Sequence, residues 1–465
     1  MRYDYDVIVI GAGFAGATAA RECSTRGLRT VLLEARDRVG GRTWTSRLTD
    51  GELIEIGGTY VHWLQPHTWS EISRYGLDTE IVAGAEPPDW ALVPAGSGLK
   101  WYGFEEHELR EKALLERFFE RSRGAVPRPF DPQFAGEMVA ELDQLSVRDR
   151  LDQMDLSPDD DAYLAGLLSL ESGDDVSKSS FLTLMRWWAL SGHNYEANQE
   201  AVFGYKLARG TVSLINAIIA DGGAELRLNE PVTAVTSDQD GVRVDTASQR
   251  TFSAPTAVIA TPSGIWPRIE FSPALSADRA AAAREGMQVA RGSRIVAVIR
   301  GESRRFYVQP HAGHPIGMMW SAHQRSSDEQ IVGLFGSPTL KDAHDPEEVT
   351  AAIQDILPHV EVAEIAAGTY MDDDAFAGGG WPFPKRGQLA RFAPHKNFAR
   401  PEGRLVFATS DIASGWCGFI DGAIESGLRA GRQVREMRHV GSQEARQPIA
   451  MLGGASSGPA ATSIG

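Results

Sequence analysis

The chain has 465 residues, of which 42% are hydrophobic and 23% charged, so it can bury the core of one large or two interleaved domains. Its 62 acidic and 46 basic residues give a formal net charge of −16, which argues against nucleic acid or an anionic membrane as partner. Two cysteines, Cys23 and Cys417, exclude a disulfide scaffold and are expected to stay reduced. No apolar run approaches the roughly 20 residues that a membrane helix needs. A strand pattern starts at Val7, so we expect no signal peptide. We therefore expect a cytoplasmic location.

The first 60 residues are predicted to form a βαβ unit. The β-branched run at 7–10 is typical of a strand buried on both faces. A helix is expected through Ala17, Ala20 and Cys23 to about Gly27, followed by a second strand at 30–34.

Residues 87–209 have charged and aromatic side chains at helical spacing and few strand patterns, so we expect an inserted, largely helical region. Further on, a glycine-containing helix is expected from about Asp421 to Val434, and a disordered tail rich in Gly, Ala and Ser from 438 to 465. Strands are predicted at 225–228, 232–235, 241–244, 257–260, 294–300 and 405–408.

A glycine-rich turn separates the first strand from the first helix. Residues 11–16 match GxGxxG, whose glycines permit a tight turn, a close approach to a pyrophosphate and close helix packing. The helix N-terminus offers unpaired N–H groups to phosphates. Glu34, at the end of the second strand, can bind a ribose diol and would repel the 2′-phosphate of NADP. This part of the chain therefore predicts dinucleotide binding.

Three further stretches favour FAD over NAD. Residues 36–42 add arginines and glycines beside the same phosphates, where NAD-binding domains usually continue with plain helix. The turn at 55–60 suits a flat ring. The strand at 403–411 leads to a helix N-terminus near 418–423, which can stabilise negative charge on a reduced flavin.

With these motifs the sequence resembles the flavin monoamine oxidase family from about Asp4 to Met437, and it is most similar to the bacterial nicotine and pseudooxynicotine amine oxidase branch. The stretches 14–23, 61–67 and 420–431 carry the closer likeness. The resemblance implies an α/β fold. Its discontinuous, Rossmann-type (glutathione-reductase-like) FAD-binding domain would comprise 1–86, 210–290 and 395–437, with an interleaved α+β substrate domain comprising 87–209 and 291–394.

The resemblance also implies positions for the cofactor. Gly380 stands where covalently flavinylated members carry cysteine, so non-covalent FAD is expected. The expected contacts of the ADP half and its phosphates are Gly11, Gly13, Gly16, Glu34, Ala35, Arg36, Gly41 and Arg42. Val232 is expected to contact the adenine, and Gly57, Gly58 and Thr59 are expected to lie along the isoalloxazine ring. Asp411 is expected at the ribityl chain and Ile420 at the pyrimidine end of the ring.

For the substrate, the resemblance implies an aromatic cage of two rings standing on the flavin. The matching residues are Trp381 and Phe419, the second in place of the commoner tyrosine. Aromatic walls suit an amine because they exclude water and attract a cation weakly. Further candidates for the lining are Trp63, Trp187, Tyr205, Trp320 and Phe335.

A second departure concerns the electron acceptor. Many members hold a lysine near flavin N5 that aids reaction with oxygen, whereas the matching strand here offers Arg294 and no lysine. Arginine stays protonated and is bulkier, so the role of the lysine does not transfer directly. The acceptor is therefore either O2, giving H2O2, or a protein or quinone.

The expected reaction is hydride transfer from the carbon next to an amine nitrogen to flavin N5, followed by hydrolysis of the imine to an aldehyde or ketone. Alternatives are an L-amino-acid oxidase, for which Arg186 could hold the carboxylate, a nicotinamide-dependent flavin reductase, and a silent flavoprotein. No second glycine fingerprint supports the reductase. We expect no metal, and a homodimer is possible. The sequence is compatible with nicotine-like, aryl-alkyl, cyclic and polyamine substrates. A long polyamine would prefer acidic residues along its channel, for which Glu171, Asp174 and Asp175 are candidates.

Overall fold

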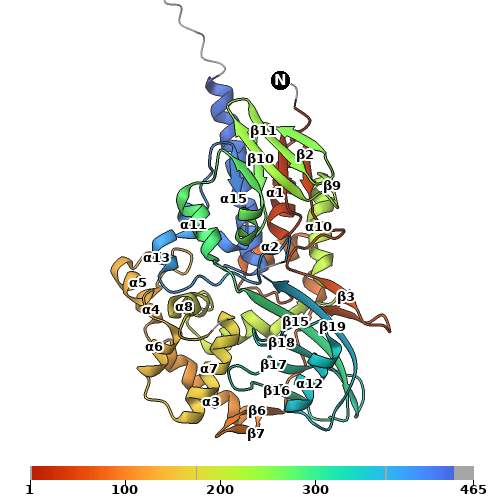
Figure 1. Cartoon of the computed structure of the whole chain (residues 1–465), viewed down its shortest axis with the longest axis vertical. Helices are drawn as coiled ribbons and strands as arrows, with labels where there is room; N and C mark the ends of the chain where they lie inside the picture. The colour runs from red at the N-terminus through yellow and green to blue at the C-terminus, as the bar shows by residue number, and fades with distance from the viewer. Residues whose placement is uncertain (1–2, 174, 372–373, 445–465) are drawn as a thin grey trace, which may run out of the picture.

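A computed structural model describes residues 3–173, 175–371 and 374–444. The molecule is elongated and has two parts stacked along its long axis (Figure 1). One part contains a parallel sheet, a smaller mixed sheet and the long C-terminal helix α15 (Ile420–Glu444). The other contains a seven-stranded sheet and most of the remaining helices.

The parallel sheet gathers strands that lie far apart in the sequence. Its central strand is β1, whose four residues Val7–Ile10 are all buried, as the β-branched run predicts. Every neighbouring pair in this sheet is parallel. In sheet order the strands are β20 (Leu405–Phe407), β13 (Ala257–Ile259), β1 (Val7–Ile10), β2 (Thr30–Leu33) and β9 (Glu225–Arg227).

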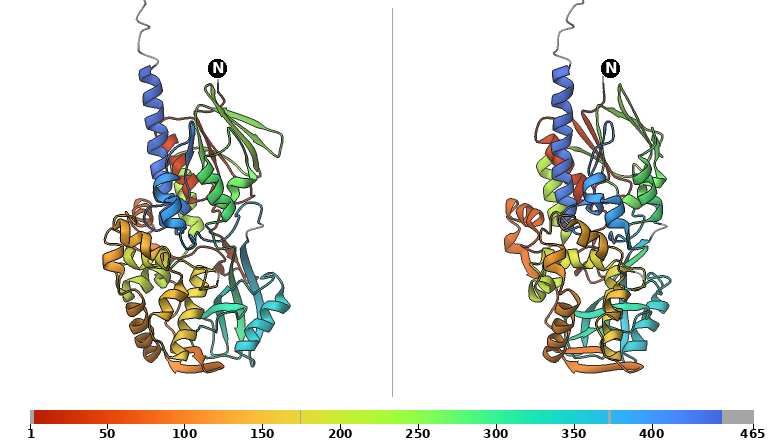
Figure 2. Two further views of the ribbon diagram at one scale, coloured as in Figure 1. Left: turned by 60° about the vertical axis from the view of Figure 1, so that its left-hand side comes forward. Right: turned by 90° about the vertical axis from the view of Figure 1, so that its left-hand side faces the viewer.

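Helix α1 (Phe14–Ser24) packs between α10 (Thr211–Gly222) and α15. The approach of α15 is close, because a Cβ on Gly427 would lie 2.5 Å from the carbonyl oxygen of Ala15. The C-terminal helix α15 is thereby held against the N-terminal helix α1 (Figure 2). Helix α2 (Pro66–Arg74) also packs against α15.

A four-stranded sheet extends the same part of the molecule. Its order is β12 (Thr251–Ala254), β11 (Gly241–Thr246), β10 (Val232–Asp238) and β14 (Glu270–Ser272). Beside it lie η3 (Ser263–Arg268) and α11 (Ala277–Glu285). Smaller elements are β3 (Thr45–Arg47), β4 (Leu53–Glu55), η1 (Asp78–Glu80), α13 (Gln388–Phe392), α14 (Pro394–Asn397) and η4 (Ser410–Ile412).

The seven-stranded sheet forms the floor of the other part. Along β15 the side chains alternate: Ile295 and Ala297 join the cluster that contains α12 (Pro346–Ile356), whereas Val296 packs with Ile54 and Ile56. In order the strands are β19 (Glu361–Met371), β15 (Arg291–Arg300), β18 (Glu329–Gly336), β17 (Ile316–Gln324), β16 (Phe306–Val308), β6 (Trp90–Ala95) and β7 (Gly98–Gly103).

The region 87–209 is mostly helical but not at its ends. It starts with the hairpin β6–β7, which completes the seven-stranded sheet because β6 pairs with β16, and it ends with β8 (Tyr205–Leu207), which pairs with β5 (Ile81–Ala83). Between them lie α3 (Phe104–Phe118), α4 (Ser122–Ala125), α5 (Gly136–Leu142), α6 (Val147–Asp152), α7 (Pro158–Ser172), α8 (Phe181–Leu190), α9 (Tyr195–Gln199) and the π-helical turn η2 (Glu200–Gly204).

The expected start of a disordered tail at 438 is wrong, because α15 continues to Glu444. Arg438 pairs with Asp6 at 3.3 Å, which attaches this turn to the N-terminal strand region. Residues 445–465 lie outside the described residues.

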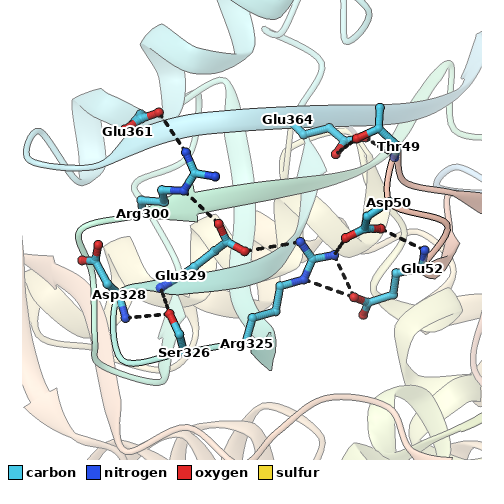
Figure 3. A network of polar contacts seen from close by, with 10 residues as sticks. All are labelled: Thr49, Asp50, Glu52, Arg300, Arg325, Ser326, Asp328, Glu329, Glu361 and Glu364. Atoms are coloured by element: carbon cyan, nitrogen blue, oxygen red, sulfur yellow. Dashed lines mark hydrogen bonds and ion pairs between the residues drawn. The ribbon is translucent and has the colours of Figure 1, made fainter.

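A polar network joins the two parts at the outer edge of the seven-stranded sheet (Figure 3). Arg325 at its centre contacts Asp50 at 2.6 Å and Glu52 at 2.7 Å, both in the turn between β3 and β4. Thr49 in the same turn donates to Glu364 on β19. The β3–β4 hairpin is therefore fixed to the sheet through charge-assisted contacts.

Candidate active site

A cavity of about 630 Å³ lies where the two parts meet. Gly11 and Gly13 from the first turn line it, and so do Ile420 and Ala423 from the first turn of α15. Two segments more than 400 residues apart in the chain therefore reach one cavity, as the motifs predict.

The glycine turn requires glycine for steric reasons. Gly11 has φ +102°, and a Cβ there would lie 2.9 Å from the carbonyl oxygen of Ala260. A Cβ on Gly16 would overlap the carbonyl oxygen of Gly11. Gly16 does not line the cavity, so it acts through packing. No side chain caps the N-terminus of α1 at Gly13, which leaves N–H groups for phosphate oxygens.

The carboxylate of Glu34 is held in place at the cavity wall. It accepts hydrogen bonds from the backbone N–H of Ala12 at 2.7 Å and of Arg36 at 2.9 Å. The side chain is buried at the end of β2. A carboxylate fixed there can accept hydrogen bonds from a ribose diol.

Arg36 and Arg42 line the same cavity, and each has internal partners. Arg36 pairs with Asp374 at 2.8 Å. Arg42 donates to the carbonyl of Gly380 at 2.8 Å and to Asp411 at 2.6 Å. Burial opposes ionisation of Asp411, but Arg42 and the N–H and hydroxyl of Ser263 outweigh it and hold its pKa below the ordinary value.

Asp411 itself is not on the wall of the cavity, although the family resemblance places it at the ribityl chain. Its neighbours Thr409 and Ser410 are on the wall, and its carboxylate positions Arg42 from behind. The other expected cofactor positions on the wall are Ala35, Gly41, Gly57, Gly58, Thr59 and Val232. We call these residues, with Gly11, Gly13, Glu34, Arg36 and Arg42, the nucleotide wall.

Both expected cage residues, Trp381 and Phe419, line the cavity. The indole N–H of Trp381 donates to the carbonyl of Glu171 at 2.9 Å, and its ring stands at 65° to that of Phe335 with centroids 6.4 Å apart. Phe419 meets Trp187 edge-on, with centroids 5.7 Å apart. We call Tyr60, Glu171, Trp187, Phe203, Arg294, Phe335, Trp381 and Phe419 the aromatic wall.

Three of the five additional lining candidates do not reach the cavity. Trp63 is 44% exposed and contacts the rings of His62 and Tyr205 at a tilt, with centroids 3.9 and 4.8 Å away, and neither Trp63 nor Tyr205 lines the cavity. Trp320 lies behind Phe335, with centroids 5.4 Å apart. Only Trp187 and Phe335 of this group are on the wall. Helical or strand spacing favours burial of an aromatic ring, as for Trp320, but it does not fix which cavity a ring faces, and Trp63 is exposed.

Sequence reasoning missed Tyr60, Phe203 and the role of Glu171. Tyr60 directly follows the expected flavin contact Thr59, a signal that could have been used. Phe203 belongs to the π-helical turn η2, which brings it beside Tyr60 with ring centroids 5.5 Å apart. Nothing in the local pattern marks that turn.

Arg294 lines the cavity as a buried cation, only 7% exposed. Its guanidinium lies 4.3 Å from the centre of the Trp320 ring and 5.2 Å from that of Phe335. Its Nη1 has no hydrogen-bond partner in the described part of the chain. Burial lowers its pKa, although Tyr60 and Glu55 act in the opposite direction.

The strand around Arg294 offers no lysine, but the fold brings one near. Burial and then the charge of Arg294 lower the pKa of Lys206, on β8. Lys206 is half-buried and does not line the cavity.

Glu171 is a carboxyl at the cavity wall without a counter-ion among the described residues. It is the next-to-last residue of α7. Burial, and then the negative charge of Glu111, raise the pKa of Glu171 to about 8. Of the other two acidic residues considered for a polyamine, Asp175 is exposed and Asp174 lies outside the described residues.

Arg186 is not where a carboxylate clamp would have to be. It is buried on α8 rather than solvated, its Nη2 donates to the carbonyl of Ser414 at 3.4 Å, and it does not line the cavity. The L-amino-acid oxidase alternative therefore loses the residue on which it rested.

No thiol faces the cavity along its described wall, where Gly380 stands. Cys23 and Cys417 are both buried and free. Within residues 3–173, 175–371 and 374–444 there is no group of three or more side chains suited to a metal ion. Over the same residues, no helix is long and apolar enough to cross a membrane.

Comparison with known proteins agrees with this site. The sequence model of one protein family, described as flavin containing amine oxidoreductase, matches residues 14–435. The chain is 37% identical to a nicotine dehydrogenase of Pseudomonas putida (strain DSM 28022 / S16), over 94% of this chain and 89% of that protein. It is 36% identical to a pseudooxynicotine dehydrogenase of a Pseudomonas species (93% and 86%) and 28% identical to an (S)-6-hydroxynicotine oxidase of Paenarthrobacter nicotinovorans (91% and 97%).

Solved structures share the fold. Putrescine oxidase bound to putrescine superposes with a TM-score of 0.76 at 20% identity, covering 93% of this chain and 99% of that one. Cyclohexylamine oxidase from Brevibacterium oxydans IH-35A gives 0.73 at 21% identity, covering 94% and 100%.

The chain belongs to the flavin containing amine oxidoreductase family. It is an enzyme that acts on amines, and its cofactor is FAD. The site fits this group, because Gly11 and Gly13 bring the backbone of the glycine turn to the cavity wall and α1 presents uncapped N–H groups there. With glycine at 380 and no thiol on the described wall, FAD is held without a covalent bond.

Proposed function

We propose that this enzyme oxidises the bond between carbon and nitrogen in a small amine that carries an aromatic ring, giving an imine that hydrolyses to an aldehyde or ketone. Bound FAD would supply the hydride acceptor. The observation that carries the proposal is the joining of the nucleotide wall and the aromatic wall in one cavity. A ring-bearing substrate is supported by the names of the relatives, two of which act on nicotine or pseudooxynicotine.

The aromatic wall would orient the amine and exclude water from it. Trp381 is held by its hydrogen bond to Glu171, and Phe419 by its edge-on contact with Trp187, so both rings are fixed before substrate arrives. Phenylalanine at 419 adds no hydroxyl that could pair with the lone pair of the nitrogen. A low-dielectric cavity also disfavours the ammonium form, which cannot release a hydride from the neighbouring carbon.

For the electron acceptor we propose a carrier other than O2. Two observations support this: the relatives at 37% and 36% identity are named dehydrogenases, and Arg294 stands where the resemblance predicts lysine. The relative at 28% identity is named an oxidase. Reduction of O2 to H2O2 stays a prediction from the sequence, and the following test decides between the two acceptors.

The test is an absorbance measurement on the purified yellow protein. Nicotine, pseudooxynicotine, phenethylamine, cyclohexylamine and putrescine are added one at a time without oxygen, and loss of the flavin band is followed. We expect bleaching by at least one ring-bearing amine, and slow recovery of colour in air but rapid recovery with a quinone. A flavin that no amine bleaches would contradict the proposed reaction, and fast recovery in air would establish O2 as acceptor.

A further inference from the structure

The proposed reaction leaves one proton unaccounted for. An alkylamine has a pKa of about 10, near that of lysine, so it reaches the cavity as an ammonium ion. The nitrogen must lose its proton before the neighbouring carbon can release a hydride. The cavity must therefore contain a proton acceptor, or the enzyme must wait for the rare neutral amine.

Most carboxylates of the cavity are already engaged. Glu34 accepts two backbone N–H groups at the nucleotide wall. Glu230, also on the wall, accepts from Thr246 at 3.0 Å and from Arg250 at 2.7 Å. Among the described lining residues, only the carboxyl of Glu171 has neither a hydrogen bond nor an ion pair.

The position of Glu171 suits a cation. Its backbone carbonyl accepts the indole N–H of Trp381, and both residues line the cavity, so Glu171 is a neighbour of a residue of the expected cage. It also lies in the last turn of α7, a helix of 15 residues whose C-terminal carbonyls favour a positive charge. An amine nitrogen beside Trp381 would therefore share the cavity with this carboxyl.

Two ionisable side chains, Glu111 and Tyr307, interact electrostatically with Glu171. Glu111 on α3 is buried and accepts hydrogen bonds from Tyr163 and, at 3.0 Å, from Tyr195. His107 lies 3.4 Å from Glu111, and Tyr307 on β16 interacts electrostatically with Glu171. No lysine or arginine contributes to the charge environment of Glu171. An entering ammonium ion would be the cation that this group of residues lacks.

We propose that Glu171 binds the substrate ammonium and accepts its proton, so that the amine is neutral when hydride leaves. This rests on the proposed amine oxidation. In the step, one N–H bond breaks, an O–H bond forms on the carboxylate, and the electron pair stays on nitrogen. Burial favours the transfer, because two charges become two neutral groups in a medium that solvates ions poorly.

The experiment compares wild type with Glu171→Gln, which keeps the shape and removes the acceptor. The rate of anaerobic flavin bleaching at saturating amine is measured from pH 6 to pH 10.5, with the amine that bleaches wild type fastest. For wild type we expect the rate to rise with pH to a midpoint near or below 8, the pKa of Glu171. For the variant we expect a midpoint near that of the free amine, about 10.

At pH 7 the variant should be slower by about a hundredfold, within the range that a general base contributes. Near pH 10 the two rates should converge, because the amine there arrives neutral. A loss of structure would slow the variant at every pH. Glu105→Gln, an exposed position in the first turn of α3, is the matched control and should keep the wild-type profile.

Glu171→Ala gives an independent test should the glutamine variant fold poorly. The space left by the side chain can admit formate, which should restore bleaching at pH 7 in proportion to its concentration. A Glu171→Gln profile that coincides with wild type, or an alanine variant that formate does not rescue, would overturn the role of Glu171 alone. Absence of bleaching in wild type would instead overturn the amine oxidation on which it rests.

Discussion

The two walls of the cavity differ in how their charges are satisfied. On the nucleotide wall the carboxylate of Glu34 and the guanidinium of Arg42 have protein partners at hydrogen-bonding distance. On the aromatic wall Glu171 has no such partner among the described residues, and the guanidinium of Arg294 lies against the rings of Trp320 and Phe335 with its Nη1 unbonded in the same part of the chain.

The difference follows from what each wall has to do. A wall that holds one cofactor permanently benefits from rigid, fully bonded groups, because their geometry is then set before the cofactor binds. A buried charge without a partner is costly, so its presence on the aromatic wall points to a group that completes its contacts only with a ligand or during the reaction. Substitutions on each wall and outside the cavity test this contrast.

Gly16→Ala should abolish cofactor binding. The new Cβ would overlap the carbonyl oxygen of Gly11, and overpacking of this kind costs about 1–3 kcal/mol or more. Displacement of the turn moves the N–H groups of α1 away from the phosphates. We expect purified protein without a flavin band and with a lower melting temperature. Gly98→Ala, which meets no atom within 4 Å, is the control, and a yellow Gly16→Ala protein would contradict the argument.

Trp381→Ala should lower turnover by about tenfold or more while flavin content is kept, because the ring belongs to the aromatic wall and not to the nucleotide wall. The measurement is the rate of amine oxidation per bound flavin. Trp63→Ala removes an equally large ring outside the cavity and should leave that rate unchanged. Equal losses in the two variants would mean that Trp381 has no special place in the site.

Arg294→Lys should speed the reaction of the reduced enzyme with O2 by about tenfold, equivalent to about 1.4 kcal/mol of activation free energy. A lysine has one compact donor group, which the ring faces of Trp320 and Phe335 hold less firmly than a guanidinium. Recovery of the flavin band after mixing with air measures this step. Unchanged recovery would show that the residue at 294 does not control the acceptor.

Glu171→Gln should change stability with pH in a defined direction. The pKa of Glu171 is raised from 4.5 to about 8 in the folded protein, so the folded state binds this proton more tightly than the unfolded state. Its stabilising contribution is complete below pH 4.5 and is lost as pH rises through 8. The variant should therefore gain a few degrees in melting temperature relative to wild type at pH 9 compared with pH 5. A pH-independent difference would place the carboxyl in a water-like environment.

Arg325→Met should have the smallest effect, about 1 kcal/mol or less, because Asp50 is exposed and Arg325 and Glu52 are only partly buried, so water still screens these ion pairs. The network that it removes joins the β3–β4 turn to the seven-stranded sheet (Figure 3), and its residues do not line the cavity. Urea unfolding measures the loss, and flavin content should be unaffected. A loss of flavin would show that this edge positions the turn at Gly57 and Gly58.

Local sequence determined much of the nucleotide wall. The strand at Val7–Ile10, the GxGxxG turn and Glu34 lie within 28 residues, so their contacts follow from one βαβ unit. Trp381 and Phe419 were predicted from the family resemblance, and both face the cavity. Trp63, Tyr205 and Trp320 were predicted to do so and do not, because periodicity reports burial but not the neighbour across the interface.

The tertiary structure alone decided the chemistry of the aromatic wall. Glu171 lies near the end of a helix whose sequence is ordinary, and its pKa is raised because the elements around it bury it and because α3 brings the charge of Glu111 near it. The resemblance singled out the position of Arg294, but only β17 and β18 place the rings of Trp320 and Phe335 against its guanidinium. Backbone turns and caps depend on adjacent residues, whereas desolvation and unpaired charge depend on every element that packs around a group.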